Sequence, residues 1–375
     1  MNKAVFAVFI LVSLITLCCM VNVSFVKAQA ANSWESKAAM PTARSGFGIA
    51  VINGNIYAIG GYNKDQTDFS AVNEKYDPST NTWVEKAPMP THRVSFGIAV
   101  FEDKIYVFGG QILVAGHRQV INFTEVYDPA SDTWSTKATM PNLGEDFAAN
   151  VVVGNKIYAI STYNDVYDPA TDSWSTKAAI PEPVAHSANA VVDGKIFVIS
   201  GTHYGNEPQF YVPINLTQIY NPATDSWSSG AAIPTGVASP AAVATVGSNA
   251  PKAIYVVGGL TLTPDSNGNI IYHPQTLTQV YYPGNDSWSL GASMPTARYA
   301  LAVGAVDDKV YAMGGSDAKT APDLPSNELY LPLGFGTVAH QVLPQSAVVG
   351  IVIVLVVILV VGAVLVWRTR ETAKA

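Results

Sequence analysis

Cysteine is almost absent from this sequence. Its two cysteines, Cys18 and Cys19, are neighbours inside an apolar run near the N-terminus. A chain from which that run has been cleaved would contain no cysteine. Such a chain could not hold a disulfide framework, so its stability would have to come from an extensive hydrophobic core.

Charged residues are also scarce, at 13% of the chain, and the two signs are unequal. Between the two apolar end segments there are 16 basic and 27 acidic residues, which gives a net charge of −11. An acidic surface repels the phosphate backbone of DNA and RNA. The composition therefore argues against a nucleic-acid partner.

The most frequent pattern is a unit of eight residues that begins with tyrosine and ends with tryptophan. Its first copy runs from Tyr76-Asp77-Pro78 to Trp83, and a proline follows seven residues after each tryptophan. The other pairs are Tyr127 and Trp134, Tyr167 and Trp174, Tyr220 and Trp227, and Tyr281 and Trp288. Constant spacing inside a unit, with roughly 40 to 60 residues between units, is typical of a repeat protein.

Each repeat also contains two short β-rich runs. In the first repeat, residues 47–51 precede the turn Asn53-Gly54, and residues 56–59 end at Gly60-Gly61. Short apolar runs between such turns are typical of hairpin strands. With a third strand at the tyrosine and a fourth at the tryptophan, each repeat predicts four antiparallel strands, which is one blade of a β-propeller.

These residues resemble the Kelch repeat over most of the central region, from Trp34 to Pro332. The marks of that family are a glycine pair after the second strand, Tyr-Asp-Pro after the third and tryptophan in the fourth. Two repeats depart from the pattern, because Ser161-Thr162 and Ser200-Gly201 replace the glycine pair. Since tyrosine and tryptophan persist in both repeats, we expect a changed local turn there and an intact blade.

The two ends of the repeat array are incomplete in complementary ways. The last repeat stops after its third strand, at residues 328–331, whereas Trp34 belongs to a fourth strand without a blade. Placing the N-terminal strand in the last blade closes the ring and removes two exposed sheet edges. The sequence therefore predicts an all-β, six-bladed Kelch-type propeller over residues 31–333, closed by an N-terminal strand.

The segments outside the repeats predict attachment to a membrane. Residues 1–30 combine a basic start, an apolar run and small residues, as in a signal peptide, with an uncleaved anchor as the alternative. After a linker at 334–346, residues 347–366 are uncharged and long enough for one transmembrane helix. The basic tail at 367–375 favours a cytoplasmic C-terminus. We expect a single-pass plasma-membrane protein whose propeller is extracellular.

The order of strands divides the loops between two faces of the predicted propeller. The loop that enters each first strand and the loop between second and third strands share one face, called here the upper face. The remaining turns form the lower face, and they are short and uniform. Loops between second and third strands vary in length and are longest at residues 259–277. Binding residues tend to lie on variable loops, so we expect a ligand site on the upper face, pointing away from the membrane.

The candidate ligand-binding residues of the upper face are arginines, histidines and acids. Arginine suits carboxylate or phosphate ligands. For the arginines that precede first strands, the alternative is a structural role, paired with backbone carbonyls or a nearby acid. The candidates are Arg44, Arg93, Arg118, Glu145, Asp146, His186, His203 and Arg298.

Other kinds of site are less well supported by the sequence. The histidine spacings do not favour a metal site, and we expect no cofactor. Three asparagines begin glycosylation acceptor sequences, namely Asn122, Asn215 and Asn285.

Three functional hypotheses follow. The favoured one is a non-catalytic binding module for an extracellular protein or glycan. The second, implied by the resemblance, is an extracytoplasmic Kelch-type enzyme that acts on sugars. Galactose oxidase has similar repeats, but its copper and Cys–Tyr cross-link cannot be carried over to a chain without mature cysteine. The third is a structural component of a surface layer.

An epimerase of sialic acid is the form of enzyme that the resemblance leaves open. It would use an arginine at the channel mouth together with acid and base side chains, and all of these must reach one substrate. The residues that could supply them are Arg44, Arg93, Glu145, Asp146 and His186. No residue is assigned a catalytic role.

Overall fold

The structure is a computed structural model, and it describes residues 30–63, 68–143, 149–203, 212–267, 269–318 and 323–336. The predicted signal peptide lies outside these residues except for Ala30, and so does the linker beyond residue 336. The predicted transmembrane helix and cytoplasmic tail also lie outside them. Within the described residues, no helix is long and apolar enough to cross a membrane.

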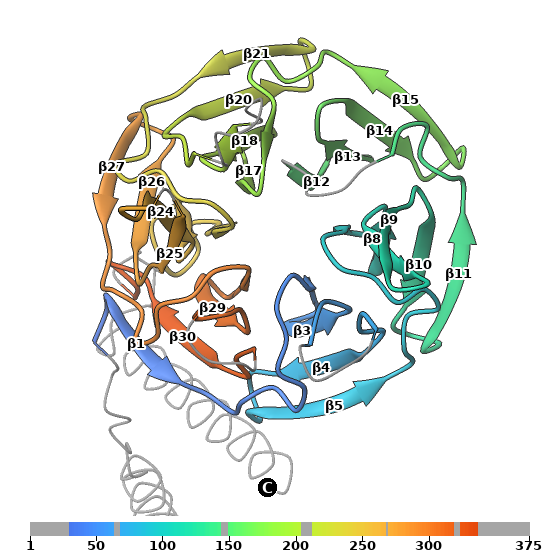
Figure 1. Cartoon of the computed structure of the whole chain (residues 1–375), viewed down its shortest axis with the longest axis horizontal. Helices are drawn as coiled ribbons and strands as arrows, with labels where there is room; N and C mark the ends of the chain where they lie inside the picture. The colour runs from blue at the N-terminus through green and yellow to red at the C-terminus, as the bar shows by residue number, and fades with distance from the viewer. Residues whose placement is uncertain are drawn as a thin grey trace, which may run out of the picture.

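Six four-stranded antiparallel sheets form a ring around a central axis (Figure 1). The first strand of each sheet lies nearest the axis, and the fourth lies at the circumference. Blade 1 consists of β2 (Gly48–Ile52), β3 (Asn55–Ile59), β4 (Asn73–Asp77) and β5 (Thr82–Lys86). Blade 2 consists of β6 (Gly97–Phe101), β7 (Lys104–Phe108), β10 (Thr124–Asp128) and β11 (Thr133–Lys137). Blade 3 consists of β12 (Ala149–Val153), β13 (Lys156–Ile160), β14 (Asn164–Asp168) and β15 (Ser173–Lys177). Blade 4 consists of β17 (Ala188–Val192), β18 (Lys195–Ile199), β20 (Thr217–Asn221) and β21 (Ser226–Ser229). Blade 5 consists of β22 (Ala241–Ala244), β23 (Ile254–Val257), β26 (Thr278–Tyr282) and β27 (Ser287–Leu290). Blade 6 consists of β28 (Ala302–Val306), β29 (Lys309–Met313), β30 (Asn327–Leu331) and β1 (Ser33–Ser36).

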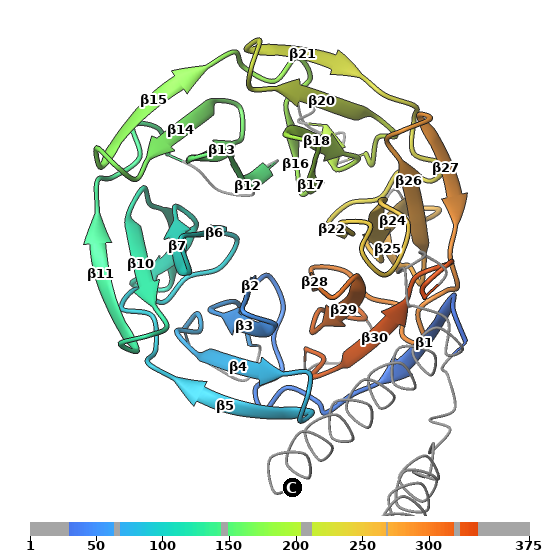
Figure 2. The same ribbon diagram turned by 180° about the vertical axis from the view of Figure 1, so that it is seen from behind.

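The N-terminal strand closes the ring, as the sequence predicts. β1 pairs antiparallel with β30 and places Trp34 opposite Tyr330, just as β5 places Trp83 opposite Tyr76 in blade 1. Figure 2 shows β1 as the outer strand of the last blade, seen from behind. Since the ring closes between the two ends of the described chain, residues 30–336 have the properties of a complete folding unit.

Three two-stranded sheets lie outside the six blades. The hairpin of β8 (Gln111–Val114) and β9 (His117–Val120) extends from blade 2, and that of β24 (Leu260–Pro264) and β25 (Ile270–Pro274) extends from blade 5. In blade 4, β16 (Val184–Ala185) pairs with β19 (Thr202–His203). All three lie beside loops that the strand order assigns to the upper face.

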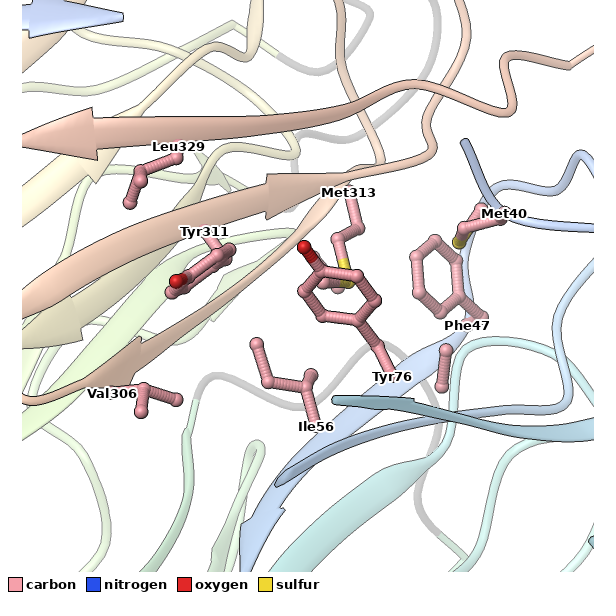
Figure 3. Packing of buried hydrophobic residues seen from close by; sticks show 10 residues of the cluster. Met40, Phe47, Ile56, Tyr76, Val306, Tyr311, Met313 and Leu329 are labelled. Carbon is pink, nitrogen blue, oxygen red and sulfur yellow. The ribbon is translucent and has the colours of Figure 1, made fainter. Parts of the chain in front are cut away.

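The hydrophobic core is divided into six clusters, one between each pair of neighbouring blades. Between blades 6 and 1, Tyr311 and Met313 of β29 meet Ile56 and Tyr76 of blade 1 (Figure 3). Ile56 and Met313 have no exposed surface. Burial of each such side chain stabilises the fold by about 1.5–3 kcal/mol, so the packing between blades supplies the stability that disulfides supply in many secreted domains.

A polar network repeats at the outer edge of every blade. In blade 2, Asp132 accepts hydrogen bonds from the Tyr127 hydroxyl and from the backbone nitrogen of Ala87 in blade 1. Trp134 Nε1 donates a hydrogen bond to Ala87 O at 2.9 Å. The residues equivalent to Asp132 are Asn32, Asn81, Asp172, Asp225 and Asp286. The network therefore ties each blade to the one before it.

The acceptor position of this network was not singled out from the sequence. All six residues have a positive φ, between 48° and 59°. Asparagine and aspartate tolerate this conformation better than most residues with a side chain. Each of them stands two residues before its tryptophan, and this spacing is the signal that could have revealed the network.

Where a repeat has a glycine pair, the pair lets two blades approach closely. Gly60 and Gly61 have φ values of 65° and 102°, which residues with a Cβ rarely adopt. A Cβ on Gly60 would lie 2.7 Å from the Phe96 ring of blade 2. Gly61 N donates a hydrogen bond to Arg93 O of that blade at 2.9 Å. Replacing either glycine would therefore disturb the contact between blades.

The two repeats without a glycine pair behave differently from each other. In blade 4, Ser200 and Gly201 keep the usual backbone, with φ values of 58° and 94°, so the prediction of a changed turn is wrong there. The Ser200 hydroxyl donates to Ile214 O at 2.7 Å, a bond that helps to hold serine in this conformation. In blade 3, Ser161 and Thr162 both have a negative φ, and the turn is changed as predicted.

Candidate functional site

The upper face is built from two sets of loops that pair with each other. Isolated β-bridges join the segment before the first strand to the segment after the second strand in four blades. The bridged residues are Ser45 and Tyr62, Val94 and Gln111, Ala238 and Leu260, and Tyr299 and Ser316. In blade 4, β16 and β19 make the same connection. The two sets of loops therefore share one face, as the strand order predicts.

A collar of backbone hydrogen bonds links five neighbouring blades around the axis at this face, within the described residues. Gly46 N donates to Ala300 O at 2.9 Å, and Ala300 N donates to Ser239 O at 3.0 Å. Ser239 N donates to His186 O at 2.8 Å, and Ser95 N donates to Gly46 O at 3.2 Å. All five residues have a positive φ. The predicted site residue His186 therefore lies in the collar, where its backbone links blades 4 and 5.

Arg44 is completely buried inside blade 1. Its guanidinium donates to Glu74 at 2.7 Å and to the carbonyls of Ala58 at 2.9 Å and Val72 at 3.0 Å. Burial lowers the pKa of Arg44 to about 10, against the opposing effect of Glu74, so the side chain stays charged at neutral pH. With 0% of its surface exposed, Arg44 holds the blade together and offers no surface to a ligand.

Arg93 and Arg298 repeat this arrangement in blades 2 and 6. Arg93 pairs with Glu125, and Arg298 pairs with Glu328 at 2.6 Å; both arginines are 0% exposed. Arg44, Arg93 and Arg298 therefore have the structural role that was the alternative in the sequence analysis. The expectation that they contact a ligand is corrected. The physical reason is that a buried guanidinium must satisfy its donors inside the protein.

Arg118 is the exposed member of the four arginines that the structure describes. It lies on β9 of the blade 2 hairpin and donates to Gln111 Oε1 at 3.0 Å. Its guanidinium carbon is 5.5 Å from the ring centre of Phe69, a residue of blade 1 that is 2% exposed. These contacts orient the guanidinium at the junction of two blades, and its other donors have no acceptor among the described residues.

The remaining predicted residues divide into two groups. His203 is exposed in β19 and lies 2.8 Å from Glu182. A comparable pair, His92 and Asp68, lies on blade 1 with a separation of 3.3 Å. Glu145 and Asp146 fall outside the described residues, so their predicted role is untested. The structure thus places Arg118 and His203 on the exposed upper face, on different blades.

Apolar side chains add to this face and were not singled out from the sequence. Leu143 is 63% exposed in the loop that enters blade 3, and Tyr163 is 48% exposed in the next loop of the same blade. Val114, Val212, Ile271 and Tyr272 are exposed on the loops and hairpins of blades 2, 4 and 5. Loop length indicated the correct face, but it gave no information on which side chains would be exposed.

Comparison with known proteins agrees with this architecture. A family model of the KLHDC2/KLHL20/DRC7 Kelch-repeats domain matches residues 17–201. Over these residues the chain is similar to Kelch repeats. The Kelch-like protein terF of Aspergillus terreus is 32% identical over 135 residues, which cover 36% of this chain and 27% of that relative. The propeller thus matches only about a quarter of the length of terF.

A solved structure has the same fold. The propeller described here is similar to YjhT, with a TM-score of 0.65 over 77% of this chain and 95% of the other. The two sequences are 17% identical. At this level of identity the similarity establishes the β-propeller fold and does not extend to a shared activity.

The turns of the lower face are short except for the loop at residues 245–253, and several charged side chains of this face form ion pairs. Lys156 pairs with Asp168 at 2.6 Å within blade 3, and Lys252 of blade 5 pairs with Asp193 of blade 4 at 2.6 Å. Both described ends of the chain also lie here, because the Asn32 backbone nitrogen bonds to Leu331 O at 2.7 Å. The lower face is therefore the side from which both flanking segments leave.

The three glycosylation candidates differ in accessibility. Asn122 is partly buried, and its Nδ2 donates to Met140 O at 2.8 Å. A glycan on Asn122 would require this side chain to leave the blade. Asn215 and Asn285 are exposed, on the upper and lower face respectively. Of the three, these two are the accessible acceptors.

The described part of the chain has no candidate metal site. No three side chains of histidine, cysteine, aspartate or glutamate come together there. The two pairs of histidine and carboxylate each supply two such groups, fewer than a structural zinc site uses. They are better described as polar contacts that fix loops of the upper face.

Proposed function

We propose that this Kelch propeller is a non-catalytic binding module of the cell surface, which presents its upper face to an extracellular protein or glycan. The observation that carries this proposal is the difference between the two faces. The upper face has the hairpins, the oriented Arg118 and several exposed apolar side chains. Most connections of the lower face are short turns, and several of the charges on this face are paired with each other. Exposed aromatic, apolar and arginine side chains are the groups that most often contribute to binding energy.

The proposed orientation follows from where the chain leaves the propeller. Ala30 and Gly336 both lie at the lower face, near blades 5 and 6, and Gly336 N donates to Asn249 O at 2.7 Å. In the proposed arrangement, residues 347–366 span the membrane below this face and the tail at 367–375 is cytoplasmic. The upper face then points outward, where it can meet a partner on another surface.

The geometry gives less support to an enzyme of the epimerase type. Two of the residues that such a site would need, Arg44 and Arg93, are fully buried and paired with glutamates. A buried guanidinium cannot contact a sugar acid. The proposal therefore assigns no catalytic residue, and a surface-layer role remains an outcome of the binding test.

The test is saturable binding of residues 30–336 to arrays of glycans and peptides. An upper-face variant carries Arg118→Ala, Leu143→Ser and Tyr163→Ser. A matched lower-face variant carries Lys195→Ala, Val246→Ser and Leu333→Ser, all at exposed positions. We expect binding to fall at least ten-fold in the first variant and to stay unchanged in the second. Equal loss in both, or no saturable binding, would contradict the proposal and favour lateral self-association, which analytical ultracentrifugation would detect.

The membrane orientation needs a separate measurement. Intact cells expressing the full chain would carry one epitope tag at residues 265–267, in the hairpin of β24 and β25, and another after residue 375. We expect antibody labelling of the first tag without permeabilisation and of the second only after permeabilisation. Labelling of the C-terminal tag on intact cells would exclude the proposed topology.

A further inference from the structure

The first strands of the six blades line an axial channel. Each strand alternates between side chains packed among the blades and side chains that face the axis. In β2, Ala50 and Ile52 are buried among the blades, whereas Ile49 and Val51 line the channel. The channel has an upper part of about 260 Å³ and a lower part of about 570 Å³. Both parts are lined by one shared ring of residues, which lies between them along the axis.

The wall of the lower part of this channel is mainly aliphatic, whereas polar groups make up more of the wall of the upper part. The ring shared by its two parts consists of Ile49, Ile98, Asn150, Asn189, Ala242 and Val303. The ring below it consists of Val51, Val100, Val152, Val191, Ala244 and Ala305. A wall of this kind gives water few hydrogen-bond partners and gives an aliphatic molecule a large contact area.

Charged groups are confined to the lower mouth among the residues that line the channel. These are Asp307 and Asp308. Asp308 is 2% exposed, and its carboxylate accepts hydrogen bonds from the backbone nitrogens of Val246, Asn249 and Ala250. This carboxylate therefore serves to hold the loop between β22 and β23. The body of the channel suits an uncharged molecule.

Two neighbouring asparagines interrupt the aliphatic wall. Asn150 of blade 3 and Asn189 of blade 4 occupy the shared ring, and Asn150 N donates to Asn189 Oδ1 at 3.5 Å. Neither Nδ2 has an acceptor among the described residues, whereas Asn73 and Asn164 each donate Nδ2 to an alanine carbonyl at 3.1 Å. The asparagine pair thus keeps hydrogen-bond donors that the protein itself does not use.

We propose that the channel is a binding site for an uncharged, elongated, mainly aliphatic molecule with one carbonyl or hydroxyl oxygen. The chain of such a molecule would contact the two aliphatic rings, and its oxygen would accept hydrogen bonds from Asn150 and Asn189. The volume and the mixture of many apolar groups with a few polar ones are those of small-molecule sites in general. The site is separate from the upper-face surface proposed above, because its lining lies on the first strands and not on the loops.

The first experiment measures the fluorescence of diphenylhexatriene, a rod-shaped hydrocarbon, with residues 30–336. We expect saturable binding of one molecule per propeller. A variant with Ala244→Leu and Ala305→Leu fills the lower ring and should lose this binding. The matched control Ala130→Leu adds one leucine at an exposed turn of blade 2 and should bind as the unmodified protein does. Absence of saturable binding, or equal binding to the filled variant, would overturn the proposal.

The second experiment tests the asparagine pair with 2-octanone as a competitor of diphenylhexatriene. In a variant with Asn150→Val and Asn189→Val, the hydrocarbon probe should bind at least as tightly as before. The ketone should compete about 2- to 10-fold less well, because it loses its hydrogen bonds. Unchanged competition by the ketone would remove the asparagines from the proposal. Valine already occupies equivalent positions of these rings, so we expect this variant to fold. It can therefore test the proposal if the leucine variant does not fold.

Discussion

Blades 1, 2 and 6 differ from blades 4 and 5 at two buried positions that face each other. In the first group an arginine before the first strand pairs with a glutamate of the third strand, as Arg298 does with Glu328. In the second group valine replaces the arginine and glutamine replaces the glutamate. Gln218 bonds to both the nitrogen and the oxygen of the Glu182 backbone at 2.9 Å, and Gln279 does the same with Thr235.

In these five blades the two charges are either both present, as an arginine–glutamate pair, or both absent. A lone buried charge is strongly unfavourable, while a neutral amide can fill the same place if its hydrogen bonds are satisfied. Blade 3 is intermediate, because Asp165 is 1% exposed and its described partners, Asn142 and Thr176, are neutral. The variants below test this rule.

The largest effect is expected from breaking a charge pair. Arg298→Ala leaves Glu328 buried without its cation, which should lower the free energy of unfolding by about 3–5 kcal/mol. The double variant Arg298→Val with Glu328→Gln copies blades 4 and 5 and should recover most of this loss. Urea denaturation measures both variants. A double variant no more stable than Arg298→Ala would show that valine and glutamine cannot replace the pair.

The next effect concerns blade 6, which is assembled from both ends of the chain. Asn32 accepts hydrogen bonds from Ala292 N and the Tyr330 hydroxyl, and its φ is 59°. Asn32→Ala loses both bonds and strains the backbone, so we expect a loss of about 2–4 kcal/mol. Asn32→Asp copies blades 2 to 5 and should cost less than about 1 kcal/mol. Similar losses in the two variants, measured by urea denaturation, would contradict this account.

Blade 3 should respond differently from the charge-paired blades. Asp165→Asn removes a buried carboxylate whose described partners are neutral donors, so we expect stability to change by less than about 1 kcal/mol. Glu328→Gln, the matched control, leaves the buried Arg298 without its anion and should cost more. Thermal unfolding of the two variants distinguishes these outcomes. A larger loss for Asp165→Asn would indicate that its carboxylate has a charged partner.

The smallest expected effect is on the pH dependence of stability. It concerns blades 2 to 5, in which an aspartate accepts the hydrogen bonds of the polar network at the outer edge. Hydrogen bonds from Tyr127, Ala87 and Lys86 lower the pKa of Asp132 to about 2, compared with about 3.9 in an unfolded chain. The lowered pKa means that the ionised form stabilises the fold above about pH 4 and that this contribution is lost as the pH falls toward 2. Asp132→Asn should therefore weaken the decrease in urea midpoint between pH 5 and pH 2. An unchanged decrease would exclude this contribution.

Much of the fold follows from spacing in the sequence. The positions of Tyr76 and Trp83, repeated in each unit, predict third and fourth strands, and the orphan Trp34 predicts closure of the sixth blade. The strand order also predicts which loops share the upper face. These inferences succeed because they depend on local hydrogen bonding and on the need to pair sheet edges, both of which a repeated sequence records.

The site was less predictable because its residues are selected by three-dimensional contacts. The sequence places Arg44 and Arg118 on the same face, and it cannot tell that one is enclosed by its blade while the other stacks on Phe69 of a neighbouring blade. Nor does it bring Asn150 and Asn189 side by side in the channel, since they belong to different repeats. The sequence by itself determined the number, order and closure of the blades. Only the tertiary structure decided which polar side chains are buried and which remain available, because burial depends on contacts between residues that are distant along the chain.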